Sequence, residues 1–201
     1  MSEERATVVV VEDEPDLADL YAAWLEDGYD VHAAYGGEEA LAVVDDLDEV
    51  DVVLLDRRMP DVSGDEVLTA LRDREVDARV AMVTAVEPDF DIVEMGFDDY
   101  LVKPVSREAL EETVSELLLR EEYADGVREL FSLASKKALL EAEKSTAELD
   151  ASEEYADLSA RIDEHRDDLD ATLDRLSESS DLSELYRDLE TEEPAPDDAG
   201  N

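Results

Sequence analysis

The sequence predicts an α/β fold for its first 120 residues, a doubly wound parallel sheet, followed by helices without further strands. Five short apolar runs alternate with stretches whose apolar residues recur at helical spacing. Three of the runs (VVVV, VDVVLL and RVAMVT) are nearly continuous and rich in β-branched residues, as strands buried on both faces are. Five strand–helix units in this order imply one sheet with right-handed crossovers. The expected strands are Thr7–Val11, Tyr29–Ala34, Val50–Leu55, Arg79–Thr84 and Asp99–Val102.

Helices are expected between these strands and after the last one. Turn signals built from Asp and Gly separate the units at residues 27–28, 36–37 and 61–64. Residues 106–120 are predicted to form the last helix of this domain. It carries the apolar residues Leu110, Val114, Leu117 and Leu118.

Two more helical stretches are predicted beyond residue 120. The first carries on one side Tyr123, Val127, Leu130, Phe131, Ala134 and Ala138. The second carries, at steps of three or four that are typical of a helix packing along a partner, Leu158, Ile162, His165, Leu169, Leu173 and Leu176. A turn near Asp150–Glu153 would make the two an antiparallel hairpin or coiled coil. The predicted domains are residues 1–120, a helical module at 121–190 that ends in the short segment Leu182–Leu189, and a disordered acidic tail at 191–201.

The composition is strongly acidic along the whole chain. Sixty Asp and Glu against 17 Lys and Arg give a net charge of −43, and 34 of the acids lie in residues 1–120 and 26 in 121–201. Electrostatic screening shortens to about 3 Å in molar salt, which removes most of the self-repulsion. We therefore expect a halophilic source. Neither half of the sequence has a basic face, so the charge distribution indicates no surface suited to binding nucleic acid.

Other features narrow the class of protein. Cys is absent, which excludes disulfides, thiolate metal sites and Cys nucleophiles. No stretch approaches the roughly 18 continuous apolar residues of a membrane span, and the acidic N-terminus is not that of a signal peptide. We expect a cytoplasmic protein without a membrane partner.

Residues that carry chemistry follow the predicted strands at their carboxyl ends. Glu12 and Asp13 follow the first strand, Asp56 follows the third, Thr84 ends the fourth, and Lys103 follows the fifth. In an open parallel sheet these ends form one edge, where functional groups gather. Three carboxylates brought together repel one another unless a cation holds them. Oxygen ligands without Cys or His suit Mg²⁺, which the sequence therefore predicts at this edge.

The same set of residues suits phosphoryl transfer. Lys103 is the only Lys in the first 120 residues, so its place at a strand end suggests a specific role. Together with Thr84 it would clamp phosphoryl oxygens, and Asp56 could attack as a carboxylate nucleophile to form an acyl phosphate. Taken singly, each residue has a simpler explanation, because an acid after one strand is unremarkable in a chain with 60 acids. The joint arrangement is what predicts a site.

Four motifs carry a resemblance to a known family. They are VVVVEDEP (Val8–Pro15), LLDRRMPDVSG (Leu54–Gly64), MVTA (Met82–Ala85) and DDYLVKP (Asp98–Pro104). Over residues 6–120 the sequence resembles the receiver domain of two-component response regulators. The resemblance implies a flavodoxin-like sheet with strand order 2-1-3-4-5. It also implies a switch that a sensor histidine kinase operates by phosphorylating one aspartate.

The resemblance further implies a role for each matching residue at the metal site. Asp56 is the phosphoacceptor, and Asp13 and Asp56 bind Mg²⁺ directly. The backbone carbonyl of Arg58 is a third ligand, and Glu12 holds the ion through water. The acid pair is Glu-Asp where the family more often has Asp-Asp.

The other matching residues respond to the phosphoryl group. Thr84 hydrogen-bonds it, Lys103 pairs with it, and Tyr100 changes rotamer to report the change. The resemblance also implies a cis peptide bond between Lys103 and Pro104. Phe97 departs from the family, which usually has Ala there, and it would add bulk beside an expected fourth helix where receivers often meet partners.

The second half resembles the HalX region of response regulators from halophilic archaea, on the segment FSLASKKALLEAEKSTAELDASEEYADL (Phe131–Leu158). One interpretation is that these helices bind a partner protein or a second copy of the chain. Another is an atypical DNA-binding module, against which the missing basic face argues. A third, a hydrolase that works through an aspartyl phosphate, is disfavoured because Arg58 stands where such enzymes carry a second acid. We therefore expect no enzyme, and His165 to be a packing residue.

Overall fold

The computed structural model describes residues 5–178, apart from the side chains of Asp91 and Glu178. The chain divides into two compact units, residues 1–118 and residues 119–201. Within residues 5–178, no helix combines the length and the apolar character that crossing a membrane requires.

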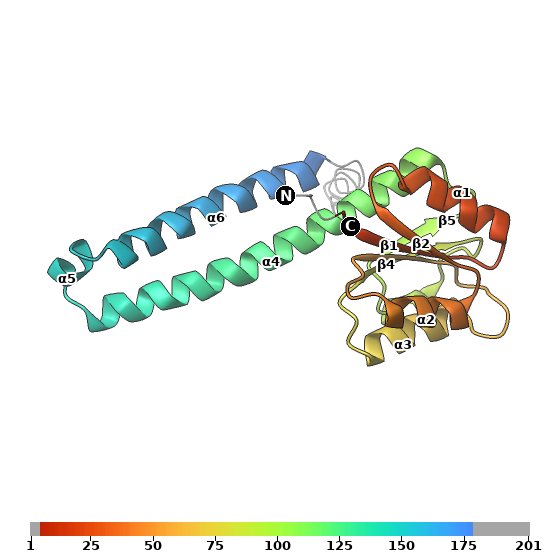
Figure 1. The fold of residues 1–201 in the computed structure, drawn as a ribbon, viewed down its shortest axis with the longest axis horizontal. Coiled ribbons are helices and arrows are strands. Elements are labelled where there is room, and N and C mark those ends of the chain that lie inside the picture. Colours follow the sequence, from red (N-terminus) through yellow and green to blue (C-terminus); the bar gives the residue numbers. More distant parts are fainter. Residues whose placement is uncertain (1–4, 179–201) are drawn as a thin grey trace, which may run out of the picture. The chain divides into compact units, whose positions relative to one another are not determined.

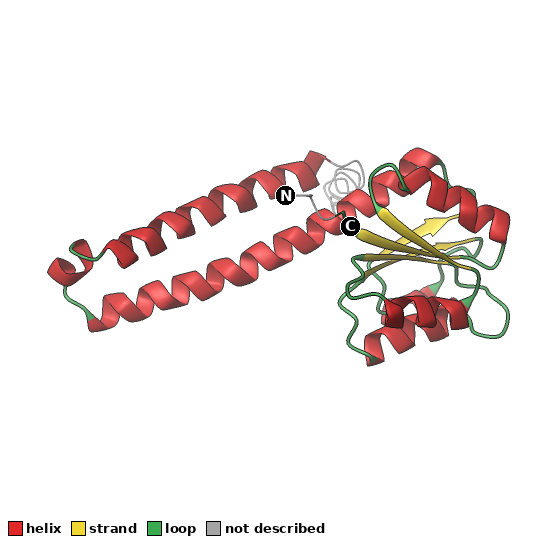
Figure 2. Ribbon diagram, viewed as in Figure 1, coloured by secondary structure: helices red, strands yellow, loops and turns green. Residues whose placement is uncertain are grey.

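The first unit contains a five-stranded sheet with the order β2-β1-β3-β4-β5, in which every neighbouring pair is parallel. Figures 1 and 2 show the strands lying between two layers of helices. This confirms the predicted doubly wound sheet and its strand order. The strands are β1 (Thr7–Val11), β2 (Asp30–Ala34), β3 (Val52–Leu55), β4 (Arg79–Thr84) and β5 (Asp99–Val102).

Three helices of this unit begin where the local sequence favours a start. Helix α1 (Pro15–Leu25) has Pro in its first turn, where the missing N–H costs nothing. Helix α2 (Gly37–Asp46) begins after Gly36. Helix α3 (Gly64–Asp73) is capped by Ser63, which forms a reciprocal capping box with Glu66.

The core lies on both faces of the sheet. On one face, α2 and α3 bury Val44, Val67 and Leu71 against β1 and β3. On the other face, α1 and the first turns of α4 (Arg107–Glu143) bury Leu25 and Leu110. The alternation of side chains along each strand divides β1 between the two faces, and its four valines are at most 1% exposed.

The crossover between β4 and β5 differs from the prediction. A fourth helix was expected there, but the chain forms only the short 3-10 helix η1 (Phe90–Glu94). Its apolar residues cannot form a buried face, because Phe90 is 91% exposed and Val93 is 77% exposed. Phe97 does not stand beside a fourth helix either. It packs on the core and against the ring of Tyr100, with the ring centroids 5.5 Å apart.

The predicted break near residue 120 is absent. Helix α4 runs without interruption for 37 residues from the first unit into the second. No Pro occurs within it, and its only Gly is Gly126, which costs a helix only about 1 kcal/mol. The short helix α5 (Thr146–Asp150) lies in the connection to α6 (Glu153–Glu178). The turn predicted at Asp150–Glu153 is therefore only the end of a longer connection, which begins at Lys144.

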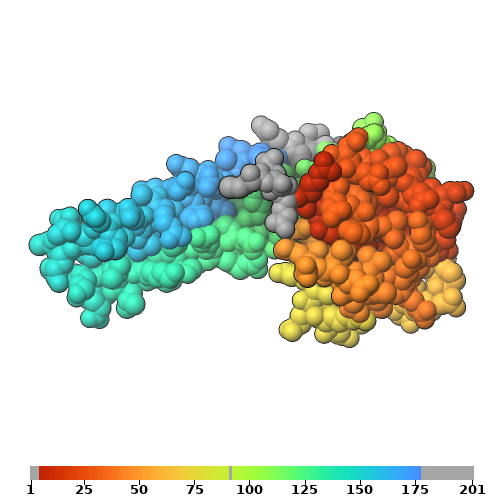
Figure 3. Space-filling view, viewed as in Figure 1, coloured from red at the N-terminus to blue at the C-terminus, as the bar shows by residue number. Residues whose placement is uncertain are grey.

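The second unit is a hairpin of two antiparallel helices, residues 119–143 of α4 and the whole of α6 (Figure 1). Figure 3 shows the two helices in contact along the hairpin. Leu133, Ile162 and Leu176 are buried between them. Leu169 approaches α4 at Gly126, where an added Cβ would lie 2.9 Å from its Cδ2 atom. The predicted pairing of two helices is thus present.

Three of the residues predicted for the apolar sides of the two helices, Phe131, Ala138 and Leu173, are exposed. Phe131 is 71% exposed, while Leu133 is buried in its place. Leu173 is 49% exposed, while Thr172 is buried. The buried or half-buried positions 162, 165, 169, 172 and 176 alternate steps of three and four, as an interhelical interface requires. The segment Leu182–Leu189 and the tail at 191–201 lie outside the described residues.

Candidate functional site

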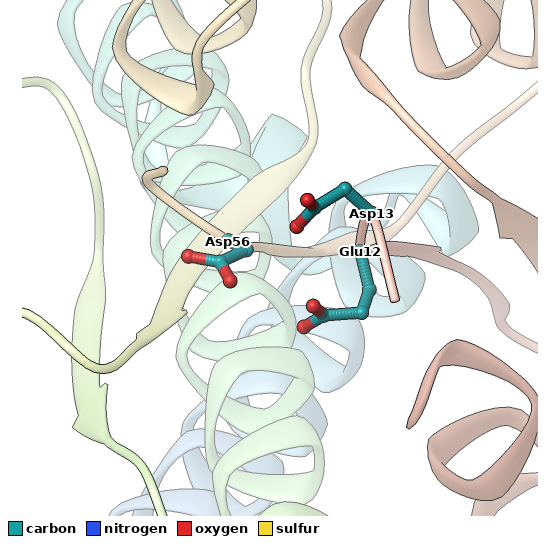
Figure 4. A group of neighbouring side chains, drawn as sticks. All are labelled: Glu12, Asp13 and Asp56. Carbon is teal, nitrogen blue, oxygen red and sulfur yellow. The ribbon is translucent and has the colours of Figure 1, made fainter. Parts of the chain in front are cut away.

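Two acids leave β1 at its carboxyl end. The strand is held by parallel neighbours on both sides, so the residues that follow it are fixed at the edge of the sheet. Glu12 donates its backbone N–H to the carbonyl of Ala34 and is only 2% exposed. Asp13 is half-buried. Figure 4 shows both side chains directed toward the end of β3.

Asp56 is the first residue after β3 and is 7% exposed. Its backbone N–H donates to the carbonyl of Val11 at 2.9 Å, which aligns the ends of the two strands. Its carboxylate Oδ1 accepts a hydrogen bond of 3.0 Å from the backbone N–H of Arg58. Ligand atoms of Glu12, Asp13 and Asp56 lie within 4.8 Å of one another (Figure 4).

Lys103 supplies a positive charge to this cluster. Its Nζ donates to Oε2 of Glu12 and to Oδ2 of Asp56, both at 2.5 Å. The side chain follows β5 at the cis peptide bond between Lys103 and Pro104, which the family resemblance implied. The structure therefore brings together four of the predicted site residues, Glu12, Asp13, Asp56 and Lys103.

The charges alter the acid–base behaviour of two of these groups. Burial raises the pKa of Glu12, and the hydrogen bond and charge of Lys103 oppose that rise only in part. Burial alone would lower the pKa of Lys103. Its hydrogen bonds to Asp56 and Glu12 outweigh that effect, so its pKa is raised and the amine is protonated at neutral pH.

Thr84 lies at the carboxyl end of β4 and is fully buried. Its carbonyl accepts a hydrogen bond of 2.8 Å from the backbone N–H of Lys103, which ties the ends of β4 and β5 together. Its hydroxyl Oγ1 accepts from the backbone N–H of Val86 at 3.4 Å. Tyr100, on β5, also contacts Val86, because its hydroxyl donates a hydrogen bond of 2.8 Å to the carbonyl of Val86. Thr84 and Tyr100 thus meet at Val86.

The loop that holds Asp56 leaves no space for a side chain at Gly64. A Cβ atom there would lie 2.1 Å from the carbonyl oxygen of Asp56 and 2.9 Å from the Cα atom of Arg57. Gly64 also donates its N–H to the carbonyl of Arg57 at 3.0 Å. The final glycine of the motif LLDRRMPDVSG is therefore required by the close return of the chain onto the loop that holds Asp56.

One contact at this loop escaped the sequence analysis. The guanidinium of Arg57 donates to both carboxylate oxygens of Asp65, with three N···O distances of 3.0 to 3.2 Å. The Arg57 side chain is 13% exposed, so this bidentate pair is shielded from salt more than a surface pair would be. It fastens the residue after Asp56 to the first turn of α3. A spacing of eight residues in an irregular loop gives no sequence signal for such a pair.

Two family profiles match the chain. The response regulator receiver domain matches residues 8–115, and the HalX domain matches residues 119–186. A proposed transcriptional regulator of Haloferax volcanii is 50% identical over 199 residues, which cover 94% of this chain and 33% of that protein. That relative comes from a halophilic archaeon, the kind of source that the acidic composition predicts.

Other relatives match mainly the first unit. The alkaline phosphatase synthesis transcriptional regulatory protein PhoP of Bacillus subtilis is 37% identical over 121 residues, covering 58% of this chain and 50% of that protein. The chain thus spans a third to a half of the length of these curated relatives. Among solved structures, the receiver domain of the Francisella response regulator 1452 is 30% identical with a TM-score of 0.53, covering 58% of this chain and 98% of that one. The chain belongs to the response regulator receiver family, and a HalX domain follows its receiver domain.

Proposed function

We propose that the first unit is a phosphorylation switch whose acceptor is Asp56. The observation that carries this proposal is the position of Lys103 between the carboxylates of Glu12 and Asp56, 2.5 Å from each. A surface ion pair needs only one acid. Two buried acids, a third within 4.8 Å and a shared lysine form a polar site that stability alone does not require.

The acids at this site fit a magnesium ion. The donor set consists of carboxylate oxygens, which hard divalent cations prefer, and it leaves coordination positions for water and phosphate. Asp13 and Asp56 would bind the ion directly, with the carbonyl of Arg58 as a further ligand and Glu12 acting through water. When bound, Mg²⁺ would offset the negative charge that gathers on the transferred phosphoryl oxygens.

The transfer would take place between a phosphohistidine of a sensor kinase and Asp56. A carboxylate oxygen of Asp56 forms a bond to phosphorus while the bond from phosphorus to the imidazole nitrogen breaks, and the released imidazole nitrogen takes up a proton. Lys103 then pairs with a phosphoryl oxygen. Lys103 suits this role because its hydrogen bonds to Asp56 and Glu12 already hold its ammonium group at the acceptor carboxylate.

Thr84 and Tyr100 are placed to convert the new charge into a change of shape. A phosphoryl group adds about −1.5 to −2 charge at pH 7, if it behaves as on other side chains. The Thr84 hydroxyl would turn toward it and give up its contact with Val86. The hydroxyl of Tyr100 donates to the carbonyl of Val86 at 2.8 Å, so a shift of Val86 would change or break this hydrogen bond of Tyr100. This would move the population between two arrangements of the β4–η1 segment.

The proposed output of this switch is a change in what the HalX domain binds, with a partner protein as the first candidate. Residues 121–201 carry 26 acids and 8 bases, which favours protein contacts over DNA. DNA binding is the second candidate, because the Haloferax relative, which matches 94% of this chain, and PhoP are both described as transcriptional regulators. Gel shifts on genomic fragments in molar KCl, with and without phosphorylation, separate the two.

Beryllofluoride, a stable mimic of a phosphoryl group, tests the switch without a kinase. One solved structure similar to this chain is the BeF3-activated receiver domain of DrrB, which is 26% identical with a TM-score of 0.51. We expect new protein-bound ¹⁹F NMR signals that require both Mg²⁺ and Asp56. The variant Asp56→Asn should give none, while Asp61→Asn in the same loop should behave as wild type. Bound signals that persist in Asp56→Asn would refute the assignment of the acceptor.

A further inference from the structure

The part of α4 that belongs to the second unit carries two rows of side chains that alternate steps of three and four. The first row faces α6, because Gly126 lies against Leu169 and Leu133 is buried between the two helices. We call the second row the outer row, and its members are Ala124, Val127, Phe131, Ala134 and Ala138. At about 100° per residue, the outer row is centred about 120° around the helix axis from Gly126. A helix with two such rows can contact two neighbours, and the described hairpin provides one of them, α6.

The outer row is apolar and open to solvent. Phe131 is 71% exposed, Ala138 is exposed, and Val127 and Ala134 are half-buried. A single exposed Phe would need no explanation. Five apolar side chains at heptad spacing instead form a continuous strip along one side of the helix, which is typical of an interaction surface.

Acids avoid the outer row, although the chain as a whole is strongly acidic. Between residues 121 and 140 of α4 the acids are Glu121, Glu122, Asp125 and Glu129. All of them lie about 100° to 180° around the helix axis from the centre of the outer row. Residues 130–140 are also the longest stretch of the chain without Asp or Glu. A second acidic chain can therefore approach this surface without bringing carboxylates together.

The hairpin buries few apolar side chains of its own. Among the described residues 119–178, these are Leu133, Ile162 and Leu176. Units of this size usually depend in addition on disulfides, a structural metal or association with another chain. Cys is absent from the sequence, and the candidate metal cluster among the described residues lies in the first unit. Association with another chain is the remaining way to cover the outer row.

The outer row is complementary to itself in an antiparallel arrangement. When Phe131 faces Ala134 of a second copy, the same two-fold axis makes Val127 face Ala138 of that copy. Each larger side chain then meets a small one, and every contact occurs twice, as an interface between identical subunits requires. A parallel arrangement would instead place Phe131 against Phe131 and leave alanine facing alanine.

We propose that the outer row is a dimer interface, on which α4 of a second copy packs in the antiparallel direction. The interhelical ion pairs of Glu122 and Glu129 lie on the opposite side of α4, so the dimer leaves them intact. Repulsion between the two acidic chains is screened beyond about 3 Å in molar salt. This interface goes beyond the proposed switch and needs no phosphoryl group, so its test is separate from that of Asp56.

Sedimentation equilibrium of the full chain in molar KCl, without a phosphodonor, tests the interface. We expect the wild type to be a dimer. Phe131→Asp should raise the dissociation constant of the dimer at least about tenfold, because it places an unpaired carboxylate in the contact. Leu139→Asp is the matched control and should leave the constant unchanged. Leu139 is 66% exposed but lies about 100° around α4 from the centre of the outer row.

Engineered cysteines test the direction and register of the two helices. The chain has no Cys, so only introduced thiols can form a disulfide. Val127→Cys and Ala138→Cys, mixed in equal amounts and mildly oxidised, should give a disulfide heterodimer by intact mass, and neither variant alone should give a homodimer. In the proposed register the two copies of residue 127 lie about 16 Å apart along the helix axis, too far for a disulfide.

Circular dichroism of each variant establishes that the helical content of the wild type is kept. A wild type that is monomeric at every concentration would overturn the proposal and leave the outer row to a different partner. A dimer that persists in folded Phe131→Asp would place the contact elsewhere on the chain and overturn it as well. Homodimers of the single-cysteine variants that form as readily as the heterodimer would contradict the antiparallel arrangement.

Discussion

Lys103 joins Glu12 and Asp56 through two hydrogen bonds of 2.5 Å from one ammonium group. The two acids come from the ends of β1 and β3, and the lysine follows β5, so a single cation links three strands of the sheet. The side chains of Glu12, Asp56 and Lys103 are 2%, 9% and 13% exposed. Removing Lys103 would leave two buried carboxylates without a compensating charge.

Lys103→Met should therefore destabilise the protein by about 3 kcal/mol in EDTA. Mg²⁺ should recover more stability in this variant than in the wild type, because the carboxylates have lost their other cation. Chemical denaturation in molar KCl, with EDTA and with Mg²⁺, measures both effects. Lys136→Met, at an exposed site, should change stability by less than about 0.5 kcal/mol. Equal effects of the two substitutions would contradict this role of Lys103.

Glu12→Gln should make the metal-free protein more stable relative to wild type as the pH rises. The pKa of Glu12 is raised by burial, so its contribution to stability is present below the usual value of 4.5 and is lost as the pH rises through its folded value. Glutamine carries no charge at any pH. The difference in unfolding free energy between variant and wild type should grow from below pH 4.5 to neutrality in EDTA. A flat or falling difference would show that Lys103 fully compensates the burial.

Gly64→Ala should damage the loop that holds Asp56. The added Cβ would lie 2.1 Å from the carbonyl oxygen of Asp56, so the backbone must move. We expect a loss of about 3 kcal/mol in stability. The comparison is Gly36→Ala, where a Cβ meets nothing within 4 Å and only the weaker N-cap of α2 should cost stability, about 1 kcal/mol. Similar melting temperatures for the two variants by circular dichroism would contradict the described loop.

Leu133→Ala should weaken the hairpin far more than Leu139→Ala. Leu133 is 3% exposed between α4 and α6, and truncating a leucine at such a site costs about 2 to 4 kcal/mol. Leu139 is 66% exposed, so its truncation should cost less than about 0.5 kcal/mol. Thermal loss of helical ellipticity measures both. Equal losses would mean that α4 and α6 do not pack as described.

The sequence predicted the sheet and the position of the acids because both follow from burial. A strand buried on both faces, such as Val52–Leu55, leaves a nearly continuous apolar run, and the predicted bounds differ from the structure by at most two residues. Since all five strands are parallel, residues that follow them must share one edge. That geometry brought Glu12, Asp13, Asp56 and Lys103 together without any information from homologues.

The features that the sequence did not predict are those for which two local conformations, or two helix registers, suit the sequence about equally well. Nothing in residues 120–123 marks either a turn or the continuation of the helix. Only the packing in the folded structure therefore shows that α4 continues. Thr172 and Leu173 are adjacent, and the register between two helices decides which one is buried. The Arg57–Asp65 pair needs the folded loop to bring its members together. The role of Tyr100 as a reporter stays a prediction.

Phosphorylation by a small acyl phosphate is the most direct test of the proposed switch. Purified full chain in molar KCl is treated with acetyl phosphate, with and without Mg²⁺, beside Asp56→Asn and Asp61→Asn, and intact mass is measured. We expect the mass of one phosphoryl group on the wild type and on Asp61→Asn, only with Mg²⁺, and none on Asp56→Asn. A phosphoryl group that appears on folded Asp56→Asn, or that needs no Mg²⁺, would contradict the proposed function.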